Sequence, residues 1–169
     1  NHPAAAASSY LDTIRLGMES PRGGTVLDQM VGTAIEVIGT SQLQKLVADL
    51  NAKSAREAAA TLETLDARRQ TWTDVMRQEN DWSRRTFAGI RYELTRWMTR
   101  KSLKLIYQKT EQKLVHEQLK TRQLMIDLAT RAYALEHGHP PAAVSDLVPD
   151  YLKAVPESAP TGTSETAAP

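Results

Sequence analysis

The chain has 169 residues, a formal net charge of +1 and no cysteine. This length predicts one compact domain, and the lack of cysteine excludes both a disulfide framework and a thiolate zinc site. Aromatic residues make up only 5% of the sequence, and the prevalence of Ala, Leu, Gln, Glu, Arg and Lys favours helices over sheet. No apolar run approaches the ~20 residues that a membrane-spanning helix needs.

The first elements are expected to be a tether and a short helix. Residues 1–7 show neither a cap nor an apolar stripe, so they are predicted to form a tether. A helix is expected to begin with Ser8 or Ser9 as its N-cap. It should end in the loop 20–24, which contains a proline and two glycines.

A second helix, which we expect to be the most buried one, is predicted over residues 25–50. Thr25 and Asp28 have the spacing of a capping-box variant, and the following apolar residues cover more than half of the helix circumference. The apolar face shifts at Gly39. The sequence therefore predicts a kink or a tight turn there, with one continuous helix as the alternative.

Nearly fifty residues without proline follow, and they predict one helix over 55–100 or two nearly collinear helices. Trp72 and Trp97 share an apolar arc of about 80° at a period of 3.6 residues, which indicates core packing. Trp82 stands alone among polar residues in a stretch where a break is plausible, and we expect it to be partly exposed.

The last long helix is predicted over 102–137, because Gly138 and the two prolines that follow prevent its continuation. A short helix is expected around 142–147, and residues 156–169 are expected to be a disordered tail. The sequence thus predicts an all-α, antiparallel bundle of about five or six helices, with long central helices, in a single domain over 8–155.

The charges are unevenly distributed. Residues 84–122 contain eleven basic and three acidic residues, a net charge of +8, whereas the segments before and after carry −3 and −4. Such a block can contact phosphate or anionic lipid, and it can equally be a solvated helix face or lie against acidic neighbours. The candidate contacts for an anionic partner are Arg84, Arg91, Arg100, Lys101, Lys104 and Lys113.

The segment 128–152 has a recognisable pattern, in which a helix with Tyr133 ends at Gly138 and two prolines fix a turn before a short amphipathic segment. This pattern resembles the segment after the long helix in the major pseudopilins of type II secretion. It also resembles the end of uncharacterised membrane-anchored helical proteins of planctomycete-type bacteria, and the upstream run within 11–36 resembles this second group better.

The resemblance implies an extracytoplasmic domain, in the periplasm or cell envelope, behind an N-terminal membrane anchor. His139 stands where the pseudopilins have an aromatic residue, and residues 157–162 lack their Asp-Pro-Phe core. Their calcium site and filament role are therefore not carried over.

No catalytic constellation is evident in the sequence. Glu136, His137 and His139 are the only cluster with metal-ligand chemistry, but Gly138 should end the helix, so the two rings would not project from one face. A solvated helix terminus is the favoured interpretation, and we expect no metal and no cofactor. The sequence also lacks a phosphate-binding loop and a nucleophile elbow.

The expected function is therefore a non-enzymatic, extracytoplasmic helical scaffold or adaptor, tethered to a membrane in the full-length protein. Its expected partner is another protein or a second copy of the chain. The alternative is that the block 84–122 binds an anionic polymer or a membrane surface. Specific nucleic-acid recognition is disfavoured, because acidic residues are interleaved with the basic ones, and no small-molecule substrate is evident.

Overall fold

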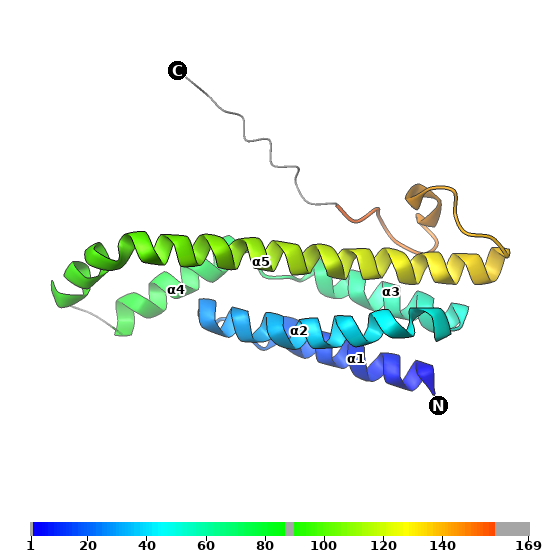
Figure 1. Ribbon diagram of the computed structural model, residues 1–169, viewed down its shortest axis with the longest axis horizontal. Helices are drawn as coiled ribbons and strands as arrows, with labels where there is room; N and C mark the ends of the chain where they lie inside the picture. Colours follow the sequence, from blue (N-terminus) through cyan, green and yellow to red (C-terminus); the bar gives the residue numbers. More distant parts are fainter. Residues whose placement is uncertain (1, 87–89, 158–169) are drawn as a thin grey trace, which may run out of the picture.

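The computed structural model describes the backbone of residues 2–86 and 90–157 and the side chains of 2–86 and 104–157. The described chain is all-helical, which confirms the predicted fold class (Figure 1). None of its helices is long and apolar enough to cross a membrane. Its elements are α1 (Pro3–Glu19), α2 (Val26–Leu46), the 3-10 turn η1 (Val47–Asp49), α3 (Ala52–Ala67), α4 (Trp72–Thr86), α5 (Ile90–His137) and the 3-10 turn η2 (Val144–Leu147).

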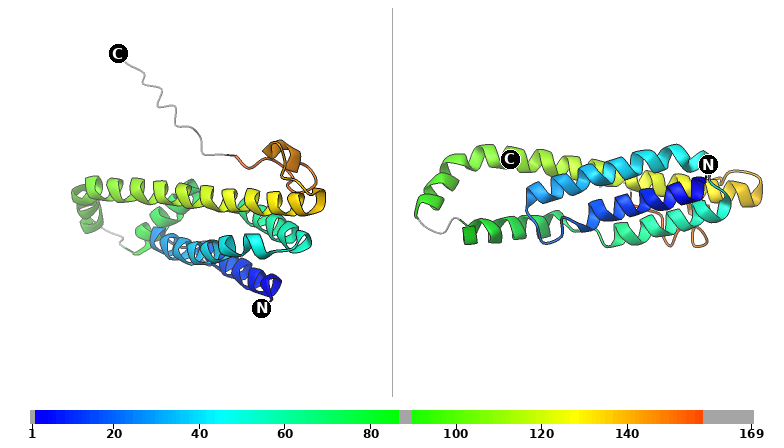
Figure 2. Two further views of the ribbon diagram at one scale, coloured as in Figure 1. Left: turned by 45° about the vertical axis from the view of Figure 1, so that its right-hand side comes forward. Right: turned by 90° about the horizontal axis from the view of Figure 1, so that it is seen from below.

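The helices form an antiparallel bundle. The chain reverses direction between α1 and α2 and again before α3, and α4 continues in the direction of α3 (Figures 1 and 2). The 48-residue α5 then returns along both of them. Around the bundle, α1 contacts α2 and α3, while α5 contacts α2 and α3 from the other side.

One continuous hydrophobic core holds these four helices together. Ile14, Leu43, Leu62 and Leu128 are fully buried in it, one from each of α1, α2, α3 and α5. After α5 the chain folds back, and Leu147 of η2 joins the same core. The C-terminal segment up to this point is therefore part of the domain.

Helices α1 and α2 pack unusually closely because glycine lies at their crossing. A Cβ atom on Gly17 would lie 2.5 Å from the backbone nitrogen of Glu36 and 2.6 Å from the carbonyl oxygen of Gly32. At Gly39, a Cβ atom would lie 2.7 Å from Cγ1 of Ile14. The predicted kink at Gly39 is wrong: α2 passes through it unbroken, and the glycine is there to admit α1.

The predicted single helix over 55–100 is wrong, because the structure divides this range into α3, α4 and the start of α5. The alternative of two nearly collinear helices matches α3 and α4, but only as far as Thr86 (Figure 1). The chain leaves the helical path at Arg68, and α4 begins after Thr71, whose hydroxyl accepts a hydrogen bond from the Asp74 amide at 3.2 Å. Helix α5 then begins at Ile90 rather than Ser102 and runs unbroken through the predicted junction. Residues 87–89, between α4 and α5, lie outside the described residues.

The two ends of the domain differ in how well they match the prediction. Helix α1 begins at Pro3, five residues before Ser8, so most of the predicted tether is helical and Ala7 is buried. Proline suits the first turn of a helix, where its missing N–H has no partner to lose. The end of α5 at His137 is confirmed, and Gly138 has the positive φ of 77° that terminates it. The predicted tail beyond residue 157 lies outside the described residues.

Candidate functional site

A buried carboxylate occupies the centre of the bundle. Glu36 of α2 is only 2% exposed. Arg69, from the segment between α3 and α4, donates to both of its oxygens, with Nη1 at 3.0 Å from Oε2 and Nη2 at 2.6 Å from Oε1. The Thr121 hydroxyl of α5 donates to Oε1 at 2.8 Å. Three elements thus meet at one carboxyl group.

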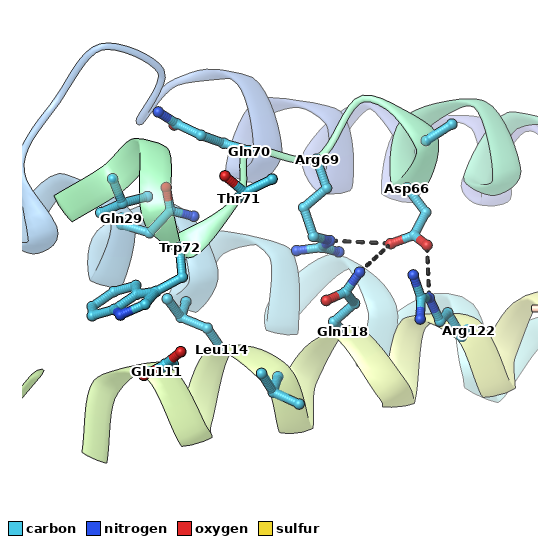
Figure 3. Close-up of a pocket in the computed structure, with 13 residues that line it drawn as sticks. Gln29, Asp66, Arg69, Gln70, Thr71, Trp72, Glu111, Leu114, Gln118 and Arg122 are labelled. Carbon is cyan, nitrogen blue, oxygen red and sulfur yellow. Dashed lines mark hydrogen bonds and ion pairs between the residues drawn. The ribbon is translucent and has the colours of Figure 1, made fainter. Parts of the chain in front are cut away.

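The same guanidinium extends the network to a second carboxylate. Arg69 Nε donates to Asp66 Oδ1 at 3.1 Å, and Arg122 Nε donates to Asp66 Oδ2 at 2.8 Å. Figure 3 shows Asp66 between these side chains and Gln118, whose amide nitrogen lies 3.3 Å from Oδ1. The network joins α2, α3 and α5 through hydrogen bonds that are strengthened by charge.

The electrostatic balance of the network favours the charged form of Arg69. Burial alone lowers the pKa of this guanidinium, but its hydrogen bonds and charge interactions with Glu36 and Asp66 outweigh burial and raise the pKa. Arg69 therefore stays protonated, and its charge is already balanced by two carboxylates.

A cavity of about 510 Å³ lies beside this network, where the chain leaves α3 and enters α4. Trp72, Val75 and Leu114 form its apolar wall, and the Arg69 network forms one end (Figure 3). Trp72 is half-buried here, so it lines a cavity rather than the core that the sequence predicted. Trp82 is 48% exposed, as predicted, and Trp97 lies outside the residues whose side chains are described.

Gln29 of α2 lines the same cavity and is 8% exposed, yet its side-chain oxygen has no hydrogen-bond partner. The buried side-chain oxygen of Gln70, another wall residue, is also unpaired. Glu111 adds a carboxylate without a partner in the described part of the chain. The residues of the cavity wall therefore include two buried amide oxygens without a partner and one carboxylate without a partner.

A second unusual feature is the outward face of α2. Leu27, Val31 and Ile38 are 68%, 55% and 60% exposed, and Ala34 between them is exposed as well. The apolar residues that predicted a deeply buried helix are therefore divided, since one face of α2 is buried and the other is open to solvent. The charge of α2 is also on the buried side rather than the exposed side. Glu36 is the only charged residue from 29 to 44, and it points into the bundle.

The candidate residues for an anionic partner whose side chains the structure describes do not share one helix face. Arg84 is exposed in the last turn of α4. Lys104 and Lys113 are exposed on α5, but nine residues amount to two and a half turns, which puts them on opposite sides. The side chains of Arg91, Arg100 and Lys101 lie outside the described residues, so this contact stays a prediction.

A different set of lysines shares one face of α5. Lys109, Lys113 and Lys120 fall within an arc of about 40° and are all exposed. Arg122, which belongs to the same basic block, instead points toward Asp66 and Glu157, whose carbonyl oxygen accepts from its Nη1 at 2.8 Å. The block is thus divided between a solvated face and the interior network.

The histidine cluster at the end of α5 is held by local contacts. The ring of His137 stacks on Tyr133 at a centroid distance of 4.1 Å, and its Nδ1 lies 3.1 Å from the Tyr133 carbonyl oxygen. Glu136 binds Arg56 and the Tyr151 hydroxyl, both at 2.6 Å. Over the described residues, no group of three or more His, Asp or Glu side chains is arranged to hold a metal ion.

Similarity to known proteins adds nothing to this geometry. Comparison with models of protein families, with curated proteins and with solved structures finds no match. The resemblance of residues 128–152 to pseudopilin and planctomycete-type segments, and the extracytoplasmic location that it implies, therefore stay predictions.

Proposed function

We propose that this chain is a non-enzymatic helical scaffold or adaptor that acts by pairing with a second copy of itself through the outward face of α2. The observation that carries the proposal is the uncharged apolar seam formed by Leu27, Val31, Ala34 and Ile38. A solvated helix face ordinarily carries charged residues, and their depletion together with exposed apolar side chains is typical of a protein interface.

The spacing of the seam supports a helix as the occupant. Its members follow one another at intervals of four, three and four residues, which is the heptad pattern of helices that pack side by side. They lie within an arc of about 60° and extend about 17 Å along α2. A second helix of similar length can cover such a strip.

The charges at the two ends of α2 favour a second copy in the antiparallel sense. Asp28 is exposed beside the start of the strip, and Lys45 is exposed in the last turn of α2, beyond the end of the strip. Hydrogen bonds from the backbone N–H and the hydroxyl of Thr25 lower the pKa of Asp28, which keeps it ionised at neutral pH. An antiparallel pair directs the acidic start of each α2 toward the basic end of the other, and its two-fold symmetry is that of most homodimers.

The experiment is sedimentation velocity of the chain over a range of concentrations, with Ile38→Glu as the test variant. Burying an isoleucine contributes about 1.5–3 kcal/mol, so the variant should weaken dimerisation about tenfold or more. Leu16→Glu is the matched control, because Leu16 is 57% exposed on α1 and lies outside the seam. The control should dimerise like the unchanged chain.

The dimerisation of the unchanged chain, Ile38→Glu and Leu16→Glu is then compared. Circular dichroism should show equal helix content in all three, since both substituted positions face solvent. A chain that stays monomeric at high concentration, or a dimer that Ile38→Glu leaves intact, would contradict pairing through α2. Loss of the dimer in Leu16→Glu alone would place the interface on α1 instead.

The cellular location is a separate part of the proposal. An extracytoplasmic position behind a membrane anchor is supported by the resemblance of residues 128–152 alone. Fractionation of cells that express the full-length gene tests it, with recovery in the membrane fraction and accessibility to protease from outside the cytoplasm as the expected result. Recovery in the cytosol would overturn the location but not the pairing through α2.

A further inference from the structure

We infer that the cavity between α2, the α3–α4 connection and α5 is a binding site for a small organic cation that carries N–H donors, of the alkylammonium or alkylguanidinium class. Its volume of about 510 Å³ lies within the usual range for small-molecule sites. The site faces the interior of the bundle. Gln29 is about half a turn around α2 from Leu27 and Ile38, so this inference is independent of pairing through the seam.

The hydrogen-bonding capacity of the wall selects a donor. The side-chain oxygens of Gln29 and Gln70 are buried and unpaired, and a buried acceptor without a partner costs free energy that an entering donor recovers. A rotation of each terminal amide can turn its oxygen toward an entering N–H group. Gln29 is more than nine-tenths buried, so bulk water does not meet this need.

The charge of the wall selects a cation. Among the residues that line the cavity, Arg69 and Arg122 carry two positive charges and Asp66 and Glu111 carry two negative ones. The carboxylate of Glu36, which binds Arg69 behind the wall, brings the net charge of the cavity and its supporting network to −1. Both arginines are already bound to carboxylates, as the contacts above show. An anion would therefore find no free cationic partner in the network, whereas Glu111 is available to a ligand.

No lysine or arginine stands three or four positions from Glu111 on its own helix, and Lys109 and Lys113, two positions away, project from other sides of it. The residues three and four positions away on α5 are Tyr107, Gln108, Leu114 and Val115. An ion pair between Glu111 and a neighbour at these positions is thus impossible. A positively charged group that enters the cavity would be the first to balance this carboxylate.

The apolar part of the wall selects an organic ion over a metal. The indole of Trp72 faces Leu114 of α5 across the wall (Figure 3), and Val75 also lines the cavity. Tryptophan is the side chain whose ring face attracts cations most strongly, and aliphatic neighbours suit an alkyl chain. A bare divalent ion would instead need several carboxylates, and the wall offers only Glu111 free.

The experiment is isothermal titration calorimetry with three probes of similar size. Butylguanidinium carries the charge and several N–H donors, butyltrimethylammonium carries the charge without a donor, and valerate carries the opposite charge. We expect butylguanidinium to bind, butyltrimethylammonium to bind about tenfold more weakly, and valerate not to bind. Failure of butylguanidinium to bind, or equal binding of valerate, would overturn the inference.

Substitutions test the location of the site. Gln29→Leu removes the buried acceptor and Glu111→Gln removes the free charge, and each should weaken binding of butylguanidinium about tenfold. Gln78→Leu is the matched control, because its side-chain oxygen is also buried and unpaired but Gln78 does not line the cavity. Glu111 lies on a partly exposed helix surface, so Glu111→Gln keeps the test decisive even if Gln29→Leu alters packing.

The pattern across the variants decides the inference. Weaker binding in Gln29→Leu and Glu111→Gln together with unchanged binding in Gln78→Leu supports the site. Unchanged binding in both test variants, or equal losses in all three, would mean that the probe binds elsewhere and would overturn it. The dimerisation of Gln29→Leu should equal that of the unchanged chain, which separates a failure of this inference from a failure of pairing through α2.

Discussion

Removing Arg69 should destabilise the fold strongly, because it leaves a charge in the core. In Arg69→Met the carboxylate of Glu36 stays 2% exposed and keeps only the hydrogen bond from Thr121 among its side-chain partners. Breaking a buried ion pair on one side typically costs about 3–5 kcal/mol. At about 2–4 °C per kcal/mol for a domain of this size, the melting temperature should fall by roughly 6–20 °C.

A double substitution separates the cost of the unpaired charge from the value of the pair. In Glu36→Leu/Arg69→Met both charges are gone, and replacing a buried pair by apolar residues is often neutral or stabilising. Most of the lost stability should therefore return. Arg77→Met is the control, because its ion pair with Asp74 is exposed and such pairs contribute about 0–1 kcal/mol.

Urea denaturation followed by circular dichroism measures all of these differences. The reasoning fails if Arg69→Met loses less than about 1 kcal/mol, which is the range of an exposed pair. The single variant Glu36→Leu completes the comparison. The reasoning also fails if the stability lost in the double variant equals the sum of the losses in Arg69→Met and Glu36→Leu, because additive losses would mean that the two charges do not interact.

Two further predictions concern α1 and α2. Gly17→Ala should cost about 1–3 kcal/mol in thermal denaturation, since its Cβ would lie 2.5 Å from the Glu36 backbone nitrogen, and an unchanged melting temperature would contradict the close crossing. Hydrogen bonds from Thr25 lower the pKa of Asp28 in the folded chain below its ordinary value of 3.8. The ionised carboxylate therefore stabilises the fold at pH values above 3.8, and this stabilisation is lost as the pH falls through the lower pKa of the folded chain. Asp28→Asn should thus be less stable than the unchanged chain at neutral pH, the difference should disappear in acid, and a difference that does not change with pH would refute this role.

Local signals were sufficient to predict the fold class. The Thr25 and Asp28 pair marks the start of α2, and Gly138 with the prolines after it marks the end of α5. These signals act within a few residues of one another, so they survive in almost any tertiary arrangement. Helix type and order could therefore be read from the sequence, and the antiparallel bundle followed from the short connections.

The break between α3 and α4 was missed because the apolar period runs through it. Leu65 and Trp72 stay in phase on one arc, as they would in a single helix. The sequence nevertheless carries a signal, since Thr71 and Asp74 repeat the spacing of Thr25 and Asp28. In both places the threonine hydroxyl donates to the aspartate carboxylate, at 2.6 Å and 2.8 Å. The apolar period shows which side of a helix faces the core, whereas the capping residues show where a helix begins and ends.

The buried network could not have been predicted from local pattern. Glu36 is bound by Arg69, 33 residues away, and by Thr121, 85 residues away. No spacing rule connects these positions, because they meet only after the helices have packed. The cavity depends on the same packing, since it lies where the unexpected break moves Trp72 off the path of α3.

Helix α2 shows how these features belong together. A surface helix ordinarily buries its apolar residues and exposes its charges, whereas α2 buries Glu36 and exposes Leu27, Val31 and Ile38. Arg69 and Thr121 bind the buried carboxylate of Glu36, so the inward face of α2 has its partners within one chain. The exposed apolar residues of α2 have no such partner within the described residues of one chain. Under the proposed pairing, a second α2 helix covers them. Dimerisation of Ile38→Glu therefore tests whether the outward face of α2 is buried against a second molecule, as its inward face is buried within one.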